Sequence, residues 1–361
     1  MDYYPAKTSL QEVFNRLIPL SSSQTRRLCQ FSQALLLAGN PHLSKIARQL
    51  EKPIKQASRI QWIRRLLDAP FLEADYVYSP FIKTLLTSYN SGVFHLLIDR
   101  TDLTDHQYDL LAINLHFHRR SIPIAWELIP NGMTGAVQQE ALINRCVPLL
   151  PQNKPIVFHG DNEFGSVAVM KHVAQLGWDF ILAQASKNAY KTAPETDFRP
   201  LGTLAVTPSQ AVYCSNLILT RTHAYTPVNL FAFYHPVYHR NRRKQDNRYY
   251  ATSLPISPNL RRIGKRRWGI ECYFKDLKSA GWQLPFSQIQ HPKRFSALIT
   301  MLNWAYTWTT ALGRWLSKTS QRHLVDDCTL PKLSLFRVGW DWLVHQLRTN
   351  QLTPVLTTLY R

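Results

Sequence analysis

Short apolar runs of strand type alternate with helical patterns between residues 94 and 184, and this order limits the fold more than any other feature of the sequence. Three strand-type runs come first: FHLLIDRTDL, DLLAINLHFH and SIPIAWELIP. An amphipathic helix follows, then a strand at PIVFHGDN, a second helix and a last strand at WDFILAQ. This order predicts an α/β sheet in which three antiparallel strands are followed by parallel strands added through helical crossovers.

Two of the predicted strands end in an acidic residue, Asp99 at the end of the first and Asp161 at the end of the fourth. In a ribonuclease-H-like sheet, which has this element order, those two strands are neighbours, so we expect both carboxylates at one edge. A carboxylate at the end of a buried strand is costly unless positive charge lies near it. Structural roles stay open for both residues, a strand-end turn for Asp99 and a helix N-cap for Asp161.

A third acidic residue, Glu271, lies in the basic segment RRWGIECYFKDLKSAGW, which we predict to be helical. At about 100° per residue, Arg267, Glu271, Phe274 and Lys278 fall on one face of that helix. The structural alternative is an exposed ladder of salt bridges between Arg267, Glu271 and Lys278.

Three carboxylates without a cluster of Cys or His predict a site for Mg²⁺, with Mn²⁺ as a substitute. Two such ions activate a water or a 3′-hydroxyl and stabilise the leaving oxygen during attack at phosphorus. We therefore expect Asp99, Asp161 and Glu271 to be both metal ligands and catalytic residues, with two ions in the site.

The charge of the chain favours a polyanionic partner. Its 361 residues include 43 Lys and Arg against 23 Asp and Glu, a formal net charge of +20 that is spread along the sequence. Nucleic acid is the expected partner, because the longest apolar runs are much shorter than the roughly 20 residues of a membrane span. The N-terminus shows no signal peptide, and five scattered cysteines without a CxxC pair fit a reducing cytoplasm.

Residues 1–85 are expected to form a helical DNA-binding region. Two short helical patterns separated by the break EKP, within residues 42–70, are typical of a helix-turn-helix. The alternative is a plain helical hairpin that packs on the rest of the protein. The side chains expected to face outward from the second helix are Lys55, Gln56, Arg59, Arg64 and Arg65.

The catalytic core is predicted to comprise residues 86–185 and 258–318, interrupted by a β-rich insertion over 186–257. The basic run at residues 239–248, expected as a turn, lies either against phosphates or in a solubilising loop; its candidate DNA-binding residues are Arg240, Arg242, Arg243 and Lys244. A strongly apolar helix follows the segment of Glu271 and must be buried. Residues 319–361 are expected to be helical and to serve dimerisation.

At these residues the chain resembles the DDE transposases of bacterial insertion sequences, of the insertion-sequence-4 type. The resemblance rests on Ile98-Asp99-Arg100-Thr101, on Asp161-Asn162-Glu163-Phe164, and on the spacing of Arg267, Glu271 and Lys278. The family signature has a Tyr three residues before its Arg, where this chain has Gly264. In the family the Tyr, Arg and Lys positions contact phosphates, so the resemblance implies this role for Arg267 and Lys278.

The resemblance also implies a cut-and-paste reaction in the bacterial cytoplasm, at the nucleoid. A homodimer would bind the terminal inverted repeats, cleave both ends, commonly through a hairpin, and join the 3′ ends to target DNA. A flipped base would stack on an aromatic residue; the candidates are Trp178, Tyr225, Phe233 and Tyr238. Two alternatives remain open, a ribonuclease-H-like nuclease without strand transfer and an inactive, transposase-derived regulator that binds DNA.

Overall fold

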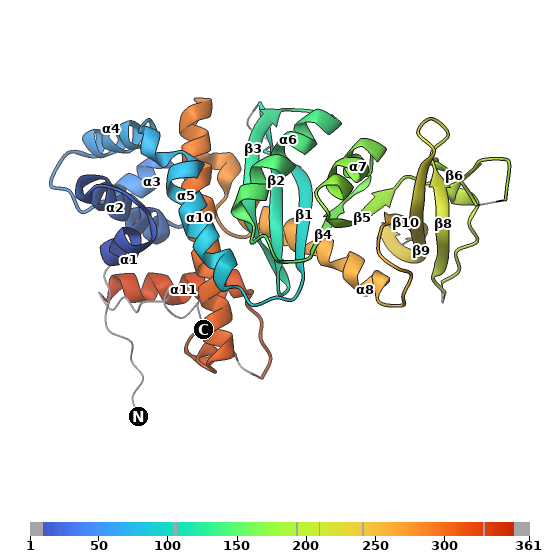
Figure 1. Ribbon diagram of the computed structural model, residues 1–361. Helices are drawn as coiled ribbons and strands as arrows, with labels where there is room; N and C mark the ends of the chain where they lie inside the picture. Colours follow the sequence, from blue (N-terminus) through green and yellow to red (C-terminus); the bar gives the residue numbers. More distant parts are fainter. Residues whose placement is uncertain are drawn as a thin grey trace.

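The computed structural model describes residues 10–103, 107–192, 194–208, 210–239, 242–327 and 329–349. They form a mixed α/β structure in which one large sheet lies beside a body of helices from both ends of the chain (Figure 1). None of the described helices has an apolar stretch long enough to cross a membrane.

The sheet has ten strands in the order β3-β2-β1-β4-β5-β10-β9-β8-β6-β7. The strands of its first half are β1 (Phe94–Asp102), β2 (Tyr108–Phe117), β3 (Arg120–Pro130), β4 (Ile156–Gly160) and β5 (Asp179–Gln184). β1, β2 and β3 pair antiparallel, whereas β4 lies parallel to both β1 and β5. The predicted strand order is thus confirmed, including the neighbouring positions of β1 and β4.

Two crossover helices link the parallel strands. Helix α6 (Ala136–Cys146) joins β3 to β4, and α7 (Val167–Gln175) joins β4 to β5. The Ser166 hydroxyl accepts a hydrogen bond from the Val169 backbone N–H, which satisfies one of the free donors in the first turn of α7.

The β-rich insertion extends the same sheet instead of forming a separate one. Its strands are β6 (Ala189–Thr192), β7 (Arg199–Pro200), β8 (Val212–Leu219), β9 (Tyr225–His239) and β10 (Arg242–Thr252). β10 pairs antiparallel with β5 and with the whole second part of β9, so it continues the core sheet. The prediction of a turn over 239–248 is corrected, because most of this run lies in β10, where the long β9 pairs with it.

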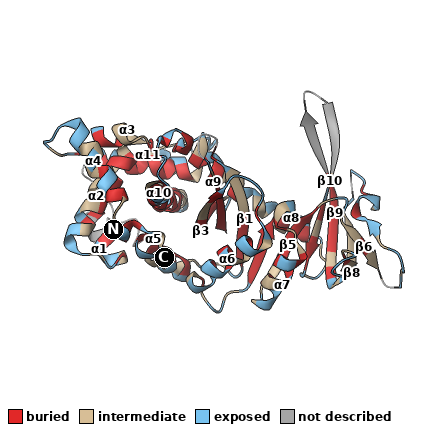
Figure 2. Ribbon diagram, turned by 90° about the horizontal axis from the view of Figure 1, so that it is seen from above, coloured by how far each residue is buried: buried red, intermediate tan, exposed pale blue. Residues whose placement is uncertain are grey.

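The helices of both chain ends share one core. The N-terminal helices are α1 (Leu10–Leu17), α2 (Ser22–Ala38), α3 (Leu43–Arg48), α4 (Gln56–Leu67) and α5 (Ala74–Ser88), and the C-terminal ones are α10 (Pro292–Lys318) and α11 (Leu335–Arg348). Figure 2 shows α10 end-on, with α2, α5 and α11 around it. Trp304 and Trp308 of α10 are fully buried, and Trp304 stacks on Phe14 of α1 with ring centroids 4.5 Å apart. The predicted burial of α10 is confirmed.

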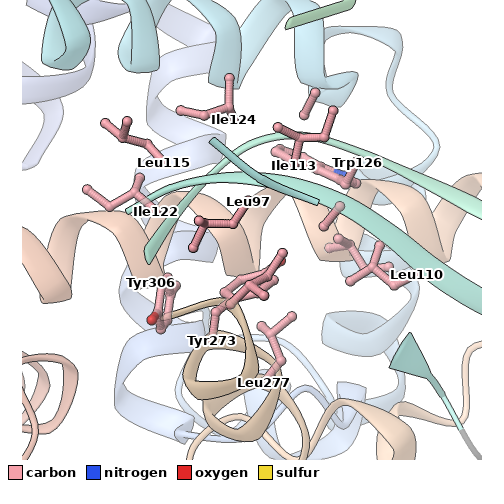
Figure 3. Packing of buried hydrophobic residues seen from close by; sticks show 14 of the residues in the cluster. Leu97, Leu110, Ile113, Leu115, Ile122, Ile124, Trp126, Tyr273, Leu277 and Tyr306 are labelled. Carbon is pink, nitrogen blue, oxygen red and sulfur yellow. The ribbon is translucent and has the colours of Figure 1, made fainter. Parts of the chain in front are cut away.

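Helix α9 (Trp268–Lys278) packs on the face of the sheet that includes Leu97, as Figure 3 shows for Tyr273 and Leu277. The Ser121 hydroxyl on β3 donates to the Gly269 carbonyl at 2.9 Å, and Tyr273 donates to Asn303 of α10 at 2.7 Å. These contacts hold the first turn of α9, which carries Glu271, against the sheet.

Replacing Asp276 of α9 by Asn is expected to stabilise the protein at neutral pH, although Asp276 pairs with Arg120 at 2.9 Å. Burial raises the pKa of Asp276 from 3.8 to about 6, more than Arg120 lowers it. Because the folded state holds this proton more tightly, the stabilisation present at low pH is lost as the pH rises through this range. The free energy of unfolding of Asp276→Asn relative to the wild type should rise by about 3 kcal/mol between about pH 4 and about pH 7. The prediction would be contradicted if denaturant titrations gave the same change in the free energy of unfolding with pH for both proteins.

Candidate active site

The strand ends place Asp99 and Asp161 side by side. The parallel pairing of β1 with β4 includes Leu97 opposite His159, and the two acids follow two residues later on each chain segment. β4 ends at Gly160, so Asp161 is the first residue after it. β1 continues to Asp102, beyond the predicted end at Asp99, because its antiparallel partner β2 extends further than β4 does. The Asp161 carboxylate also accepts from the Glu163 N–H at 2.9 Å, so its N-cap role is confirmed.

Glu271 is brought to the same place by the packing of α9. Side chains alternate along β1, so Asp99 faces the same side as Leu97, the side that α9 covers. Arg267, one turn before Glu271, connects the two acids: its Nη1 donates to Asp99 Oδ2 at 2.9 Å, and its Nη2 donates to Glu271 Oε1. The salt bridge between Arg267 and Glu271, which was expected as the structural alternative, is therefore present. Arg267 also binds Asp99, so the pair belongs to a larger cluster at the sheet edge.

One guanidinium thus faces three carboxylates. Burial raises the pKa of Asp99 to about 6; Arg267 opposes this shift, while the charges of Asp161 and Glu271 add to it. Burial alone would lower the pKa of Arg267, but Asp99, Glu271 and Asp161 outweigh it and raise that pKa. Asp99, Asp161 and Glu271 therefore all act on the same guanidinium, and the charges of Asp161 and Glu271 oppose ionisation of Asp99.

A second ion-pair network, which the sequence analysis did not include, joins the two strand ends. Arg100 donates to both carboxylate oxygens of Glu163, at 3.1 Å each for Nε to Oε1 and Nη2 to Oε2, and it also pairs with the buried Asp109. Thr134 donates to Glu163 through its backbone N–H at 2.9 Å and its hydroxyl at 2.8 Å. Since Arg100 follows Asp99 and Glu163 lies two residues after Asp161, this network fixes the spacing of the two catalytic candidates.

The three acids have the hard oxygen donors that suit a divalent cation. Within the described residues, however, no three His, Cys, Asp or Glu side chains are close enough to hold a metal ion as they stand. The guanidinium of Arg267 lies between Asp99 and Glu271 and supplies positive charge there. The donor chemistry fits a metal ion, provided that Arg267 moves aside.

The comparison with protein families decides what this arrangement belongs to. Residues 129–308 match the family model described as "Transposase DDE domain". This half of the chain is a transposase DDE domain. The matched segment includes Asp161 and Glu271, whereas Asp99 lies before its first residue. The protein is thus an enzyme of the DDE transposase class.

Two other comparisons were made. A search of curated proteins found no match. Among solved structures, the transposase is similar to a "piggyBac transposase synaptic complex with hairpin DNA" determined by cryo-EM, with a TM-score of 0.43 and 10% identity, over 94% of this chain and 73% of the other.

A cavity of about 530 Å³ opens beside Glu271 in the transposase. Its walls include the aromatic residues Phe233, Tyr250 and Trp268, and Gly264 lies among them. A Cβ at position 264 would lie 3.4 Å from Cζ of Phe231, which is an ordinary van der Waals contact. Trp268 is 64% exposed and therefore accessible to a ligand. Tyr250 and Trp268 were not among the sequence candidates.

The other DNA-binding candidates differ in their exposure and in their hydrogen bonds. Lys278 reaches the end of β1, where its Nζ donates to the Asp102 carbonyl at 2.6 Å. On α4, Lys55, Gln56, Arg64 and Arg65 are exposed. Arg59, expected to face outward, instead donates to the backbone carbonyls of Ile54 and Lys52, at 3.1 Å and 2.6 Å, because the short break between α3 and α4 leaves these acceptors free.

Some candidates fall where the structure describes little or nothing. Arg240 lies outside the described residues, and Arg242, Arg243 and Lys244 are described only as part of β10. Of the aromatic candidates, Tyr238 belongs to β9, Trp178 and Tyr225 are half-buried, and Phe233 lines the cavity beside Glu271.

Proposed function

We propose that this enzyme is a cut-and-paste DNA transposase that binds terminal inverted repeats, cleaves the element ends and joins their 3′ ends to target DNA. One observation carries the proposal: Asp99 and Glu271, from separate elements, bind a single guanidinium whose pKa Asp161 also raises, at the edge of the sheet where Asp161 follows β4. No structural need explains three carboxylates at that point, because one arginine neutralises only one of them.

In this proposal Asp99, Asp161 and Glu271 hold two Mg²⁺ ions, with Mn²⁺ as a substitute. Such ions activate a water or a 3′-hydroxyl and stabilise the leaving oxygen in an in-line displacement at phosphorus. The chain's own residues position these acids: the Arg100–Glu163 network sets the strand ends, and α9 presents Glu271. The side chain of Asp99 is 14% exposed and that of Glu271 is 34% exposed, so a ligand can reach both from solution.

Arg267 and Lys278 would contact DNA phosphates near the cleaved bond. Arg267 is 21% exposed and sits at the entrance of the site, so a phosphate can draw its guanidinium away from the acids as metal enters. Two Mg²⁺ ions would bring four positive charges in place of the single charge of Arg267, and the three carboxylates together with a DNA phosphate would balance them.

The cavity beside Glu271 would accept a base flipped out of the DNA end. Phe233 and Tyr250 stack there with ring planes 10° apart, and the exposed Trp268 provides a third aromatic surface. Base stacking on an aromatic side chain contributes about 1–3 kcal/mol. Gly264, where the family has its Tyr, lies in the same wall of the cavity.

The rest of the chain would recognise and synapse DNA. The exposed residues of α4 and the basic run on β9 and β10 supply positive charge for the inverted repeat, and a homodimer would hold two ends together. The apolar faces of α10 and α11 are buried within the chain, so the dimer would use other surfaces. This activity places the protein in the bacterial cytoplasm, at the nucleoid.

The test is cleavage of a plasmid that carries the two ends of the element, in Mg²⁺ and in EDTA. We expect Mg²⁺-dependent excision, and transfer of pre-cut 3′ ends into a second plasmid. Cleavage without end transfer would favour a nuclease instead. Binding of the ends without any cleavage would favour an inactive regulator and would overturn the proposal.

A further inference from the structure

A second cavity lies at the end of the sheet opposite the acids, and its lining is basic. It holds about 220 Å³ between the end of α5, the turn from β2 to β3 and the last turns of α10. Tyr89, His118, Arg314 and Lys318 are among its walls. No Asp or Glu of the described chain lines it. In Figure 1 this region is the lower end of α10 and of the β1–β2 pair.

Two arginines at or near this cavity, Arg314 and Arg266, lack side-chain partners in the described part of the chain. Within the described residues, neither guanidinium forms a side-chain hydrogen bond or an ion pair. Both are half-buried, so their charge is only partly compensated by water. Tyr89 and Arg314 line the cavity together, and the charges of Arg266 and Arg314 act against the rise in the pKa of Tyr89 that burial causes. A concave surface of one charge sign concentrates its field on whatever anion enters.

We propose that this cavity binds a backbone phosphate of DNA, at a point remote from the bond that is cleaved. Its volume is below the roughly 300 Å³ of pockets for drug-sized ligands, which suits a phosphate group with part of its sugar. Arg314 and Lys318 contact the phosphate, and Tyr89 and Asn90 border it. The proposal rests on the proposed function, since DNA reaches this cavity only if the enzyme binds DNA along the sheet.

The distance between the two sites is compatible with one duplex. The ring of Tyr89 lies 6.0 Å from that of Phe94, the first residue of β1. From Phe94 to Asp99 the strand rises about 17 Å, at about 3.3 Å per residue. Successive phosphates of one DNA strand are about 3.4 Å apart along the helix axis. A duplex that runs over the surface in the direction of β1 would therefore put this contact about five base pairs from the cleaved phosphate.

The test is the salt dependence of binding to a 30-bp mixed-sequence duplex, measured by fluorescence anisotropy between about 50 and 200 mM salt. Affinity falls as salt rises, and loss of one phosphate contact in Arg314→Gln should make the slope of log affinity against log salt less steep by about 0.9. Lys318→Gln should act in the same direction, and Arg314→Lys should keep the wild-type slope. The control is Lys171→Gln, because Lys171 is exposed on α7 and has no bonding partner in the described chain.

Equal slopes for Arg314→Gln, Lys171→Gln and the wild type would overturn the inference and leave the proposed function intact. Equal losses in both variants would overturn it too, because net charge alone would explain them. A second measurement is the shift in melting temperature that inorganic phosphate causes. If Arg314→Gln loses this shift but keeps the wild-type slope for DNA, the cavity binds a small anion and not DNA. A wild-type protein without measurable binding would overturn both proposals.

Discussion

Replacing Glu271 by Gln is expected to reduce end cleavage by about a thousandfold or more, which corresponds to about 4 kcal/mol in the activation barrier. Gln keeps the size of the side chain but loses the charge that a metal ion requires. DNA binding should persist at wild-type affinity or better, because the change removes a negative charge beside Arg267. The measurement compares single-turnover cleavage rates in Mg²⁺ with affinities from anisotropy.

The matched control is Glu140→Gln, the same chemical change on α6. The side chain of Glu140 has no hydrogen bond or ion pair within the described residues, so its variant should cleave at the wild-type rate. Wild-type cleavage by Glu271→Gln would remove Glu271 from the site. A loss of both binding and cleavage would instead indicate a folding defect, which thermal melting would reveal.

Replacing Gly339 by Ala is expected to cause the largest loss of stability, at least about 3 kcal/mol, at the upper end of the cost of overpacking. α10 and α11 cross here with their backbones in contact. A Cβ at Gly339 would lie 1.8 Å from the Thr309 carbonyl oxygen, and one at Gly313 would lie 1.8 Å from that of Leu335. Both obstacles are backbone atoms, so no side-chain rotation relieves the clash, and the helices must move apart.

Denaturant titrations of Gly339→Ala against Gly92→Ala would check this. A Cβ at Gly92 meets no atom within 4 Å, so its variant should stay within about 1 kcal/mol of the wild type. An equal effect of the two substitutions would show that the crossing of α10 and α11 is not as close as the structure has it. Since α10 also carries the Asn303 partner of Tyr273 on α9, Gly339→Ala should weaken cleavage as well.

The sequence by itself determined the order of the first five strands and the positions of Asp99 and Asp161. Both follow from local physics: apolar periodicity distinguishes strands from helices, and short helical crossovers make β1 and β4 parallel neighbours. The spacing of Arg267 and Glu271 is equally local, since residues four apart on a helix meet.

Only the tertiary structure decided what those residues contact. Arg267 could face solvent or the sheet, and the packing of α9 turned it toward Asp99. Arg59 appeared basic and exposed, yet backbone carbonyls from a neighbouring loop engage it. Arg314 and Tyr89 are 225 residues apart in the chain and meet only because α5 and α10 end at the same side of the sheet. Such contacts depend on how whole elements pack, and no local pattern of residues encodes them.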